Sequence, residues 1–215
     1  MKSLIENKKL LIETGAFGAG MLLFALFIHS KLPLLFFSYA GLLLAAVILG
    51  RIFFKETNLL EIFGLSKLSA KVLLISFVGL LFGAAIGVQY RLLLGSSILP
   101  RFFSTFVLLS ALIGITEELL YRGYVQGRVK PFGPIFAIGF AALLHSGYKV
   151  FLFILPPAGV STDLLSLALY TLWGGLGFGI LREISGSVLP PLLAHAAFDI
   201  IVYAEYAKAP WWVWS

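Results

Sequence analysis

Long apolar segments recur along this chain, and each is about the length needed to cross a lipid bilayer. A bilayer core of about 30 Å requires roughly twenty apolar residues per helix. On that measure, membrane spans fall at residues 10–29, 33–54, 71–94, 102–127, 131–147, 162–182 and 187–206. Only 12% of the 215 residues are charged, whereas 60% are hydrophobic. The sequence therefore predicts an all-α, polytopic transmembrane bundle of about seven spans, with residues 1–215 forming a single integral membrane domain.

Two intervening segments allow alternative interpretations. Residues 149–159 are apolar but short and contain Pro156-Pro157, which favours an interfacial or re-entrant piece over an eighth span. Residues 55–71 mix charges with Leu, Ile and Phe at helical spacing. That pattern favours an amphipathic segment on the membrane surface, and a solvated loop is the alternative. The tail WWVWS, with Tyr203 and Tyr206 before it, predicts an aromatic anchor at the interface.

Lysine and arginine are distributed unequally between the two ends of the spans. With the N-terminus inside, ten lie on the cytoplasmic side: Lys2, Lys8, Lys9, Arg51, Lys55, Lys67, Lys71, Arg128, Lys130 and Arg182. Five lie on the opposite side: Lys31, Arg91, Arg101, Lys149 and Lys208. This excess predicts a cytoplasmic N-terminus. Because the basic residues stand singly at helix ends, we expect no nucleic acid partner despite the net charge of +6. The short chain without long loops favours a prokaryotic cell membrane.

Small residues and a cap signal give local predictions. Glycines recur every four residues at Gly79, Gly83 and Gly87, and again at Gly175 and Gly179. Such rows allow helix backbones to approach closely in lipid, so we assign them to packing. Asp163 follows Ser161-Thr162 and is typical of a helix N-cap.

Polar residues interrupt three of the apolar segments. They are Glu117, Glu118, Arg122, His145, His195 and Asp199. An ionisable residue at such depth is costly unless it faces a polar interior, so it marks a functional site by default. Groups on three helices at comparable depth can meet, and we therefore expect one catalytic cavity between core helices.

The run ITEELLYRGY contains two adjacent carboxylates and one arginine. Glu118 and Arg122 are four residues apart and share a helix face, so they can pair. Glu117 points about 100° away and lacks that partner. This division predicts that one acid is held ionised while the other is free to act as a general base.

The histidines extend the pattern. His195 and Asp199 are also four apart, and a carboxylate beside a histidine fixes its tautomer in catalytic and metal sites alike. His145 stands alone on its segment. The HExxH, GxSG and GxGD motifs are absent, as are cysteines, so common zincin, rhomboid, aspartyl intramembrane and thiol protease signatures are missing.

Together these motifs resemble those of the CPBP intramembrane proteases, the family of CAAX-processing Rce1 enzymes and bacteriocin-immunity (Abi) proteins. EELLYR matches EExxxR, one histidine follows on the next span, and HAAFD matches HxxxD/N, in the family's order. The resemblance covers about residues 70–206, which we take as the catalytic core. One departure is the second motif, usually FxxxH: position 141 is alanine and Phe140 stands one residue earlier, which predicts looser packing around His145.

The resemblance implies an intramembrane endopeptidase acting on a membrane-embedded or lipidated peptide. Glu117 would activate a water that it holds together with His145, and Arg122 would hold Glu118 as an electrostatic support. His195 and Asp199 would donate to the oxyanion, Asp199 only when protonated. Two glutamates and two histidines could also ligate zinc, but no i,i+4 histidine pair is present, and we expect neither metal nor cofactor.

Two other classes remain compatible with the residues. A proton-coupled transporter would use buried Glu, His and Arg as a relay, but no inverted repeat is evident. A non-catalytic scaffold or immunity protein of the same fold would keep the polar pocket to bind a membrane peptide. The sequence discloses neither the substrate, nor a prenyl requirement, nor the oligomeric state.

Overall fold

The computed structural model describes residues 4–56, 58–65, 68–156 and 163–205. Its regular structure is entirely helical over these residues, which confirms an all-α polytopic bundle. Five helices of the described part are long and apolar enough to cross a bilayer. They are α1 (Leu4–Phe27), α2 (Leu35–Lys55), α4 (Ala70–Leu93), α7 (Pro134–Ile154) and α8 (Leu164–Ser185). The expected span at 187–206 is α9 (Leu189–Tyr203), a shorter apolar helix of 15 residues.

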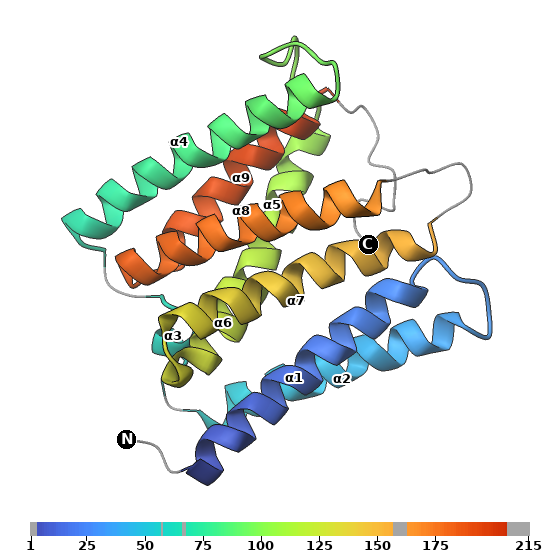
Figure 1. The fold of residues 1–215 in the computed structure, drawn as a ribbon, viewed down its shortest axis with the longest axis vertical. Coiled ribbons are helices and arrows are strands. Elements are labelled where there is room, and N and C mark those ends of the chain that lie inside the picture. The colour runs from blue at the N-terminus through green and yellow to red at the C-terminus, as the bar shows by residue number, and fades with distance from the viewer. Residues whose placement is uncertain (1–3, 57, 66–67, 157–162, 206–215) are drawn as a thin grey trace.

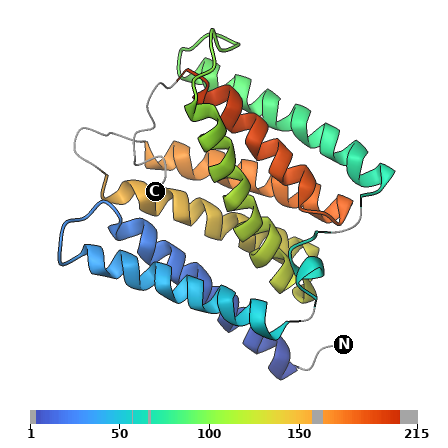
Figure 2. The ribbon, with the colours of Figure 1, turned by 180° about the vertical axis from the view of Figure 1, so that it is seen from behind.

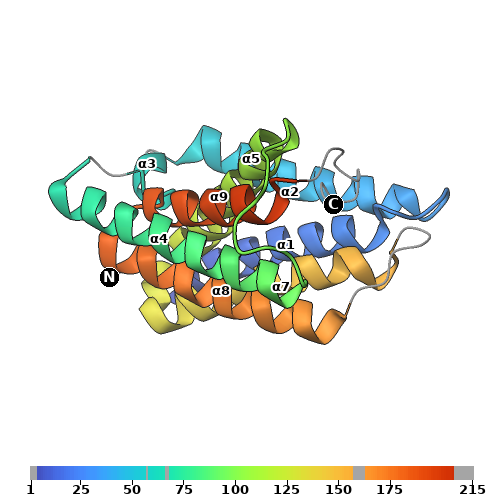
Figure 3. The same ribbon diagram turned by 90° about the horizontal axis from the view of Figure 1, so that it is seen from above.

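The helices pack in pairs, and one helix crosses them. α1 packs against α2, α7 against α8, and α4 against α9. In Figure 1 these helices form tilted rows, from α4 at the top to α2 at the bottom. α5 (Phe106–Glu118) crosses the rows steeply and packs on α9 (Figures 1 and 2). Seen from above, α7 and α8 lie on one side of the molecule and α2 and α5 on the other (Figure 3).

The expected span at 102–127 is a composite helix. After α5 the chain continues as a π-helix, η1 (Leu119–Val125), then as α6 (Gln126–Val129) and a 3-10 turn, η2 (Lys130–Phe132). π-Helical segments are rare and frequently occur at functional sites. Here the segment contains Arg122, and beyond it Gln126 Nε2 donates to the carbonyl of Gly179 at 3.0 Å. Gly133, at φ 98°, then turns the chain into α7.

The prediction for residues 149–159 was wrong where the structure describes them. α7 continues unbroken through Ile154, so residues 149–154 are its last turns rather than a separate interfacial piece. No proline or glycine interrupts the helix between Tyr148 and Ile154, and Pro156 follows its end. Residues 157–159 lie outside the described ranges. As a consequence, Lys149 belongs to the body of a membrane helix rather than to an outer loop.

The linker after α2 is docked onto the bundle. It forms only one helical turn, α3 (Leu59–Ile62), followed by the buried Phe63. Arg182 Nη2 donates to the carbonyl of Ile62 at 3.0 Å, and the backbone N–H of Val188 donates to the carbonyl of Gly64 at 2.9 Å. The part of 55–71 that the structure describes is therefore docked on the bundle rather than a solvated loop, and its contact with the membrane surface stays a prediction.

Close backbone packing explains the first glycine row. A Cβ atom on Gly79 would lie 2.7 Å from the carbonyl oxygen of Pro190, and one on Gly83 would overlap the carbonyl of Ala194. α4 therefore presses directly on the backbone of α9 and fixes the position of the helix that carries His195. The N-cap prediction is also confirmed, because the Asp163 carboxylate accepts hydrogen bonds from the N–H groups of Leu165 and Ser166. Tyr206 and the WWVWS tail lie outside the described residues.

Candidate active site

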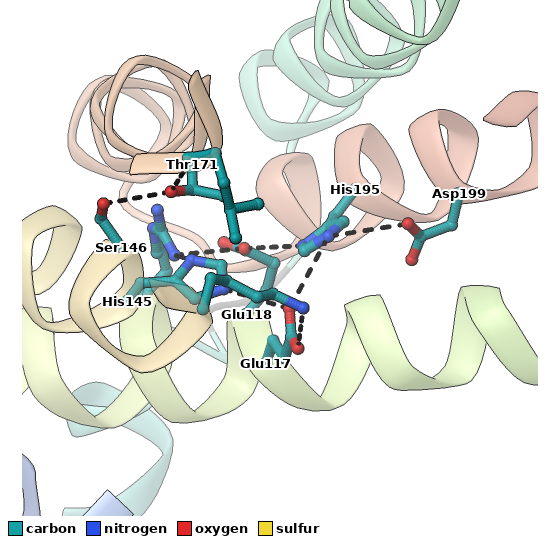
Figure 4. A network of polar contacts seen from close by, with 10 residues as sticks. Glu117, Glu118, His145, Ser146, Thr171, His195 and Asp199 are labelled. Carbon is teal, nitrogen blue, oxygen red and sulfur yellow. Dashed lines mark hydrogen bonds and ion pairs between the residues drawn. The ribbon is translucent and has the colours of Figure 1, made fainter. Parts of the chain in front are cut away.

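The structure brings all six predicted site residues together. Glu117 and Glu118 end α5, Arg122 lies in η1, His145 is in α7, and α9 carries His195 and Asp199. All six are buried in the bundle. Figure 4 shows the two glutamates between His145 and His195, with Asp199 beyond His195. Residues that are distant in the sequence thus form one polar cluster where α5, α7 and α9 meet.

Glu118 is the fully buried anchor of this cluster. Its Oε1 atom lies 3.2 Å from Nη1 of Arg122, the pairing expected from their spacing. The same oxygen lies 2.9 Å from Nδ1 of His195. Asp199 is more distant, with 3.8 Å between its Oδ1 atom and Nε2 of His195. The carboxylate that orients His195 is therefore Glu118 rather than the neighbouring Asp199, because contact across helices is closer than contact within α9.

Hydrogen bonds define the tautomer of His145. Nη1 of Arg122 lies 2.6 Å from Nδ1 of His145, and a guanidinium can only donate, so Nδ1 accepts. The proton must then be on Nε2, which lies 3.0 Å from Oε2 of Glu117 and donates to it. His145 therefore presents an N–H group to Glu117 and keeps no basic nitrogen for the site.

Lys149 is a site residue that the sequence analysis missed. Its Nζ atom forms an ion pair with Oε1 of Glu117, so Glu117 is not without a cationic partner as its helix spacing alone had implied. Lys149 follows His145 by four residues and lies on the same face of α7. The i,i+4 rule that paired Glu118 with Arg122 would have found it. The expected span ends at residue 147, which places Lys149 in a loop.

A second missed residue is Gly114, one helical turn before Glu118. A Cβ atom at this position would lie 2.9 Å from Cδ2 of His195 and would overlap the carboxylate of Asp199. Only glycine lets α5 and α9 approach so closely at the site. In the sequence, this residue can be recognised as a glycine that precedes Glu117 by three residues and Glu118 by four.

Neighbouring side chains hold His145 in place. The ring of Tyr121 stacks on its imidazole, with 4.5 Å between ring centroids and an interplanar angle of 16°. On the adjacent position of α7, Ser146 Oγ donates to the carbonyl of Ala168 at 2.9 Å and receives a bond from Thr171 at 3.1 Å (Figure 4). Ala141 is fully buried. The looser packing expected from alanine at 141 is therefore not observed around His145.

An apolar groove leads to Glu117. The cavity has a volume of about 340 Å³ and lies between α1, α5, η1 and α7. Its lining residues are Met21, Leu109, Leu112, Ile113, Thr116, Glu117, Leu120, Tyr121 and Tyr148. Glu117 is the one carboxylate of the described residues that lines it.

The donor atoms do not match a zinc site. No group of three or more His, Asp or Glu side chains among the described residues is arranged to hold a metal ion. Each glutamate already faces a cation, Lys149 or Arg122, and His145 directs its only lone pair at Arg122. A divalent cation at Glu117 would be repelled by Lys149, and His145 would offer it an N–H group rather than a ligand.

Comparison with known proteins gives one match. A family model described as "Rce1-like: Type II CAAX prenyl endopeptidase Rce1-like" matches residues 99–201, which contain α5 through most of α9 and all six predicted site residues. No curated protein and no solved structure matches the chain. The match supports a protease of the membrane and confirms the resemblance that the motifs indicated. Residues 99–201 of this integral membrane protein are thus similar to the Rce1-like type II CAAX prenyl endopeptidases.

Proposed function

We propose that this protein is an intramembrane endopeptidase that uses Glu117 to activate water against a peptide bond. The observation that carries the proposal is the position of Glu117 at the meeting point of an apolar groove and a buried polar cluster. The groove suits a membrane-embedded or lipidated segment, and the cluster supplies the groups that hydrolysis requires. The family match points to the same reaction class.

In this mechanism Glu117 accepts a proton from water, and the resulting hydroxide attacks the carbonyl carbon. Glu117 then passes the proton to the leaving amine, so that one water is consumed and one peptide bond is broken. The N–H group of His145 orients the Glu117 carboxylate, and Tyr121 and Arg122 orient His145. Glu118 and Arg122 form a buried ion pair that supports the two histidines.

A single proton between His195 and Asp199 would stabilise the oxyanion. Nδ1–H of His195 is directed at Glu118, so a neutral His195 has no second N–H for the substrate. The negative charges of Glu117 and Glu118 neutralise the positive charges of Lys149 and Arg122. We therefore assign no net charge to His195 and Asp199 taken together. Their shared proton then lies either on Nε2 of His195 or on the Asp199 carboxylate, 3.8 Å away. With the proton on Nε2, the donor stands beside Glu117, since Nε2 of His195 lies 3.8 Å from Oε2 of Glu117.

We propose that the reaction proceeds without a metal, because Lys149 and Arg122 occupy the electrostatic role that a cation would have at the two glutamates. The positive charges lie on this chain's own side chains, and the water is activated by the carboxylate alone.

The test compares new protein N-termini by mass spectrometry in membranes that contain wild type, Glu117→Gln or Glu61→Gln at equal levels. Glu61 is an exposed glutamate on α3 and serves as the matched control. We expect cleavage products near membrane boundaries with wild type and Glu61→Gln and none with Glu117→Gln. Identical N-termini in all three, with all three folded, would reject hydrolysis and favour a non-catalytic scaffold.

A further inference from the structure

A second cavity lies at the end of the bundle where α1 begins and α2 ends. We call it the α1–α2 cavity. Its volume is about 310 Å³, and its lining residues are Glu6, Lys9, Leu10, Glu13, Arg51, Ile52, Lys55, Glu56 and Arg128. The first turns of α1 and the last turns of α2 form its walls, because the two helices pack side by side (Figure 1). It shares no lining residue with the groove at Glu117, and the proposed hydrolysis does not use it.

Arg128 neutralises two of the three carboxylates in this cavity. Its Nε atom lies 3.0 Å from Oε1 of Glu13, and its Nη2 atom lies 2.8 Å from Oε1 of Glu56. The Arg128 side chain is almost fully buried. One guanidinium thus joins α6 both to α1 and to the residue that follows α2. Because Arg128 holds both carboxylates, the other cations of the cavity are not needed to balance them.

The other three cations are exposed and lie on two helices. Arg51 and Lys55 are four residues apart on one face of α2, and Lys9 lines the same cavity from α1. None of the three forms an ion pair with a carboxylate of the described residues. Four cations and three carboxylates line the cavity, which leaves a net charge of +1. A phosphodiester carries a single negative charge and would neutralise it, whereas a phosphomonoester carries nearly two.

Apolar surface beside these cations indicates the source of the phosphodiester. Ile12 follows Lys9 by three residues, and Val47 precedes Arg51 by four, so each lies about one helical turn further into its span than the cation. Ile12 is 72% exposed and Val47 is 58% exposed. A headgroup in the cavity would therefore have its acyl chains along these side chains. A soluble phosphodiester would gain nothing from them.

We propose that the α1–α2 cavity binds the phosphodiester headgroup of an anionic glycerophospholipid. Lys9, Arg51 and Lys55 donate to the phosphate oxygens, because charge-assisted hydrogen bonds from lysine and arginine are the strongest that such a group can receive. The acyl chains run along the exposed apolar surface of α1 and α2. The bound lipid joins these two helices beside the contacts of Arg128 and so stabilises their docking on α6.

The test measures lipid binding and stability in neutral detergent. Phosphatidylglycerol and phosphatidylcholine with identical acyl chains are titrated separately, and lipid-bound protein is quantified by native mass spectrometry. The cavity variant is the triple substitution Lys9→Gln, Arg51→Gln and Lys55→Gln. The matched control removes the same charge from exposed lysines outside the cavity, with Lys8→Gln, Lys71→Gln and Lys130→Gln. A third protein keeps every charge of the cavity, with Lys9→Arg, Arg51→Lys and Lys55→Arg.

The quantity of interest is the Kd for phosphatidylcholine divided by the Kd for phosphatidylglycerol. Both values come from one preparation, so this ratio does not depend on how much of a variant folds. We expect wild type to bind phosphatidylglycerol about 5- to 10-fold more tightly, the effect of about one unit of net charge at a membrane surface. The preference should persist in the matched control and in the charge-keeping protein and fall below about 2-fold in the cavity variant.

Thermal unfolding gives a second readout. Phosphatidylglycerol should raise the thermal midpoint of wild type and of the matched control more than phosphatidylcholine does. This difference should be absent from the cavity variant. If the three cations only attract anionic lipid from helix ends in general, both triple Gln variants will lose the preference equally, which would overturn the inference.

The soluble headgroup separates a lipid from a free phosphodiester. Glycerophosphoglycerol, the deacylated form of phosphatidylglycerol, should fail to displace the lipid even in large molar excess, because it lacks the acyl chains. Displacement at equal concentration would assign the cavity to a soluble phosphodiester, and equal affinity of wild type for the two lipids would reject an anion site. Neither readout requires cleavage, so these results do not depend on the proposed endopeptidase.

Discussion

A Cβ atom on Gly175 would lie 2.6 Å from Nη2 of Arg122, so α8 approaches the buried guanidinium as closely as a glycine allows. Gly174, the preceding residue on α8, would meet no described atom within 4 Å. The two positions thus share a helix and a residue type but differ in their distance from the site. The second glycine row, Gly175 and Gly179, therefore begins beside the Arg122 guanidinium, and its role goes beyond helix packing.

This pair gives the first prediction. Gly175→Ala should displace Arg122 and with it His145, lowering both the thermal midpoint and Glu117-dependent cleavage. Gly174→Ala should leave cleavage unchanged and stabilise the protein by up to about 1 kcal/mol, because alanine favours the helix. Thermal unfolding in detergent and the cleavage assay measure both. Equal effects of the two substitutions would contradict the contact.

Arg122 and Glu118 should be strongly coupled in stability. Arg122→Met leaves a buried carboxylate without its cation, which we expect to cost about 3–5 kcal/mol of unfolding free energy. Adding Glu118→Gln removes that uncompensated charge, so the double variant should be more stable than Arg122→Met alone while remaining inactive. A double-mutant cycle by denaturant unfolding checks this. Strictly additive losses would show that the pair is not coupled.

The stacking partner of His145 should matter through its ring rather than its hydroxyl. No described residue forms a hydrogen bond with the Tyr121 hydroxyl, which is buried. Tyr121→Phe should therefore keep stability within about 1 kcal/mol and retain cleavage. Tyr121→Ala removes the ring from His145 and should cost about 3–5 kcal/mol, with loss of activity. A large defect in Tyr121→Phe would assign the hydroxyl a role that this geometry does not include.

Glu205 should make stability depend on acidity. Its carboxylate accepts from the backbone N–H of Arg101 at 2.7 Å and pairs with Arg91 at 2.8 Å, so the pKa of Glu205 lies below its usual value of 4.5. A carboxyl group whose pKa is lower in the folded than in the unfolded protein stabilises the fold at pH values above the unfolded-state pKa. This stabilisation is lost as the pH falls through the folded-state pKa. Glu205→Gln should therefore lower the thermal midpoint at pH 7, and the difference from wild type should shrink below pH 4.5. A difference that stays constant across this range would argue against the ion pair.

The sequence predicted the membrane bundle and the six polar residues because both depend on local rules. Apolar length identifies spans, and i,i+4 spacing pairs Glu118 with Arg122. The contact between His195 and Glu118 could not be predicted in this way, because it depends on how α5 and α9 rotate against each other. Lys149 was within reach of the spacing rule, but the expected end of its helix at residue 147 concealed it.

The catalytic roles of the six residues remain predictions, since their convergence shows proximity and not chemistry. The structure adds the positions of the protons on the two histidines, which residue spacing alone cannot give. Because Arg122 can only donate, it determines which nitrogen of His145 carries a proton, and Glu118 does the same for His195. In the proposed mechanism, these two assignments leave Glu117 as the base and place donors around it.

The π-helix between α5 and α6 makes this region sensitive to helical pitch. If Leu119–Val125 closed into a regular α-helix without losing a residue, the extra residue that its wider turn holds would rotate Gln126–Val129 by about 100° relative to the two glutamates. Gln126 would then lose the carbonyl of Gly179, and Arg122 would leave its place beneath His145. In this segment, a change of backbone hydrogen bonding that preserved every polar side chain would still dismantle the site.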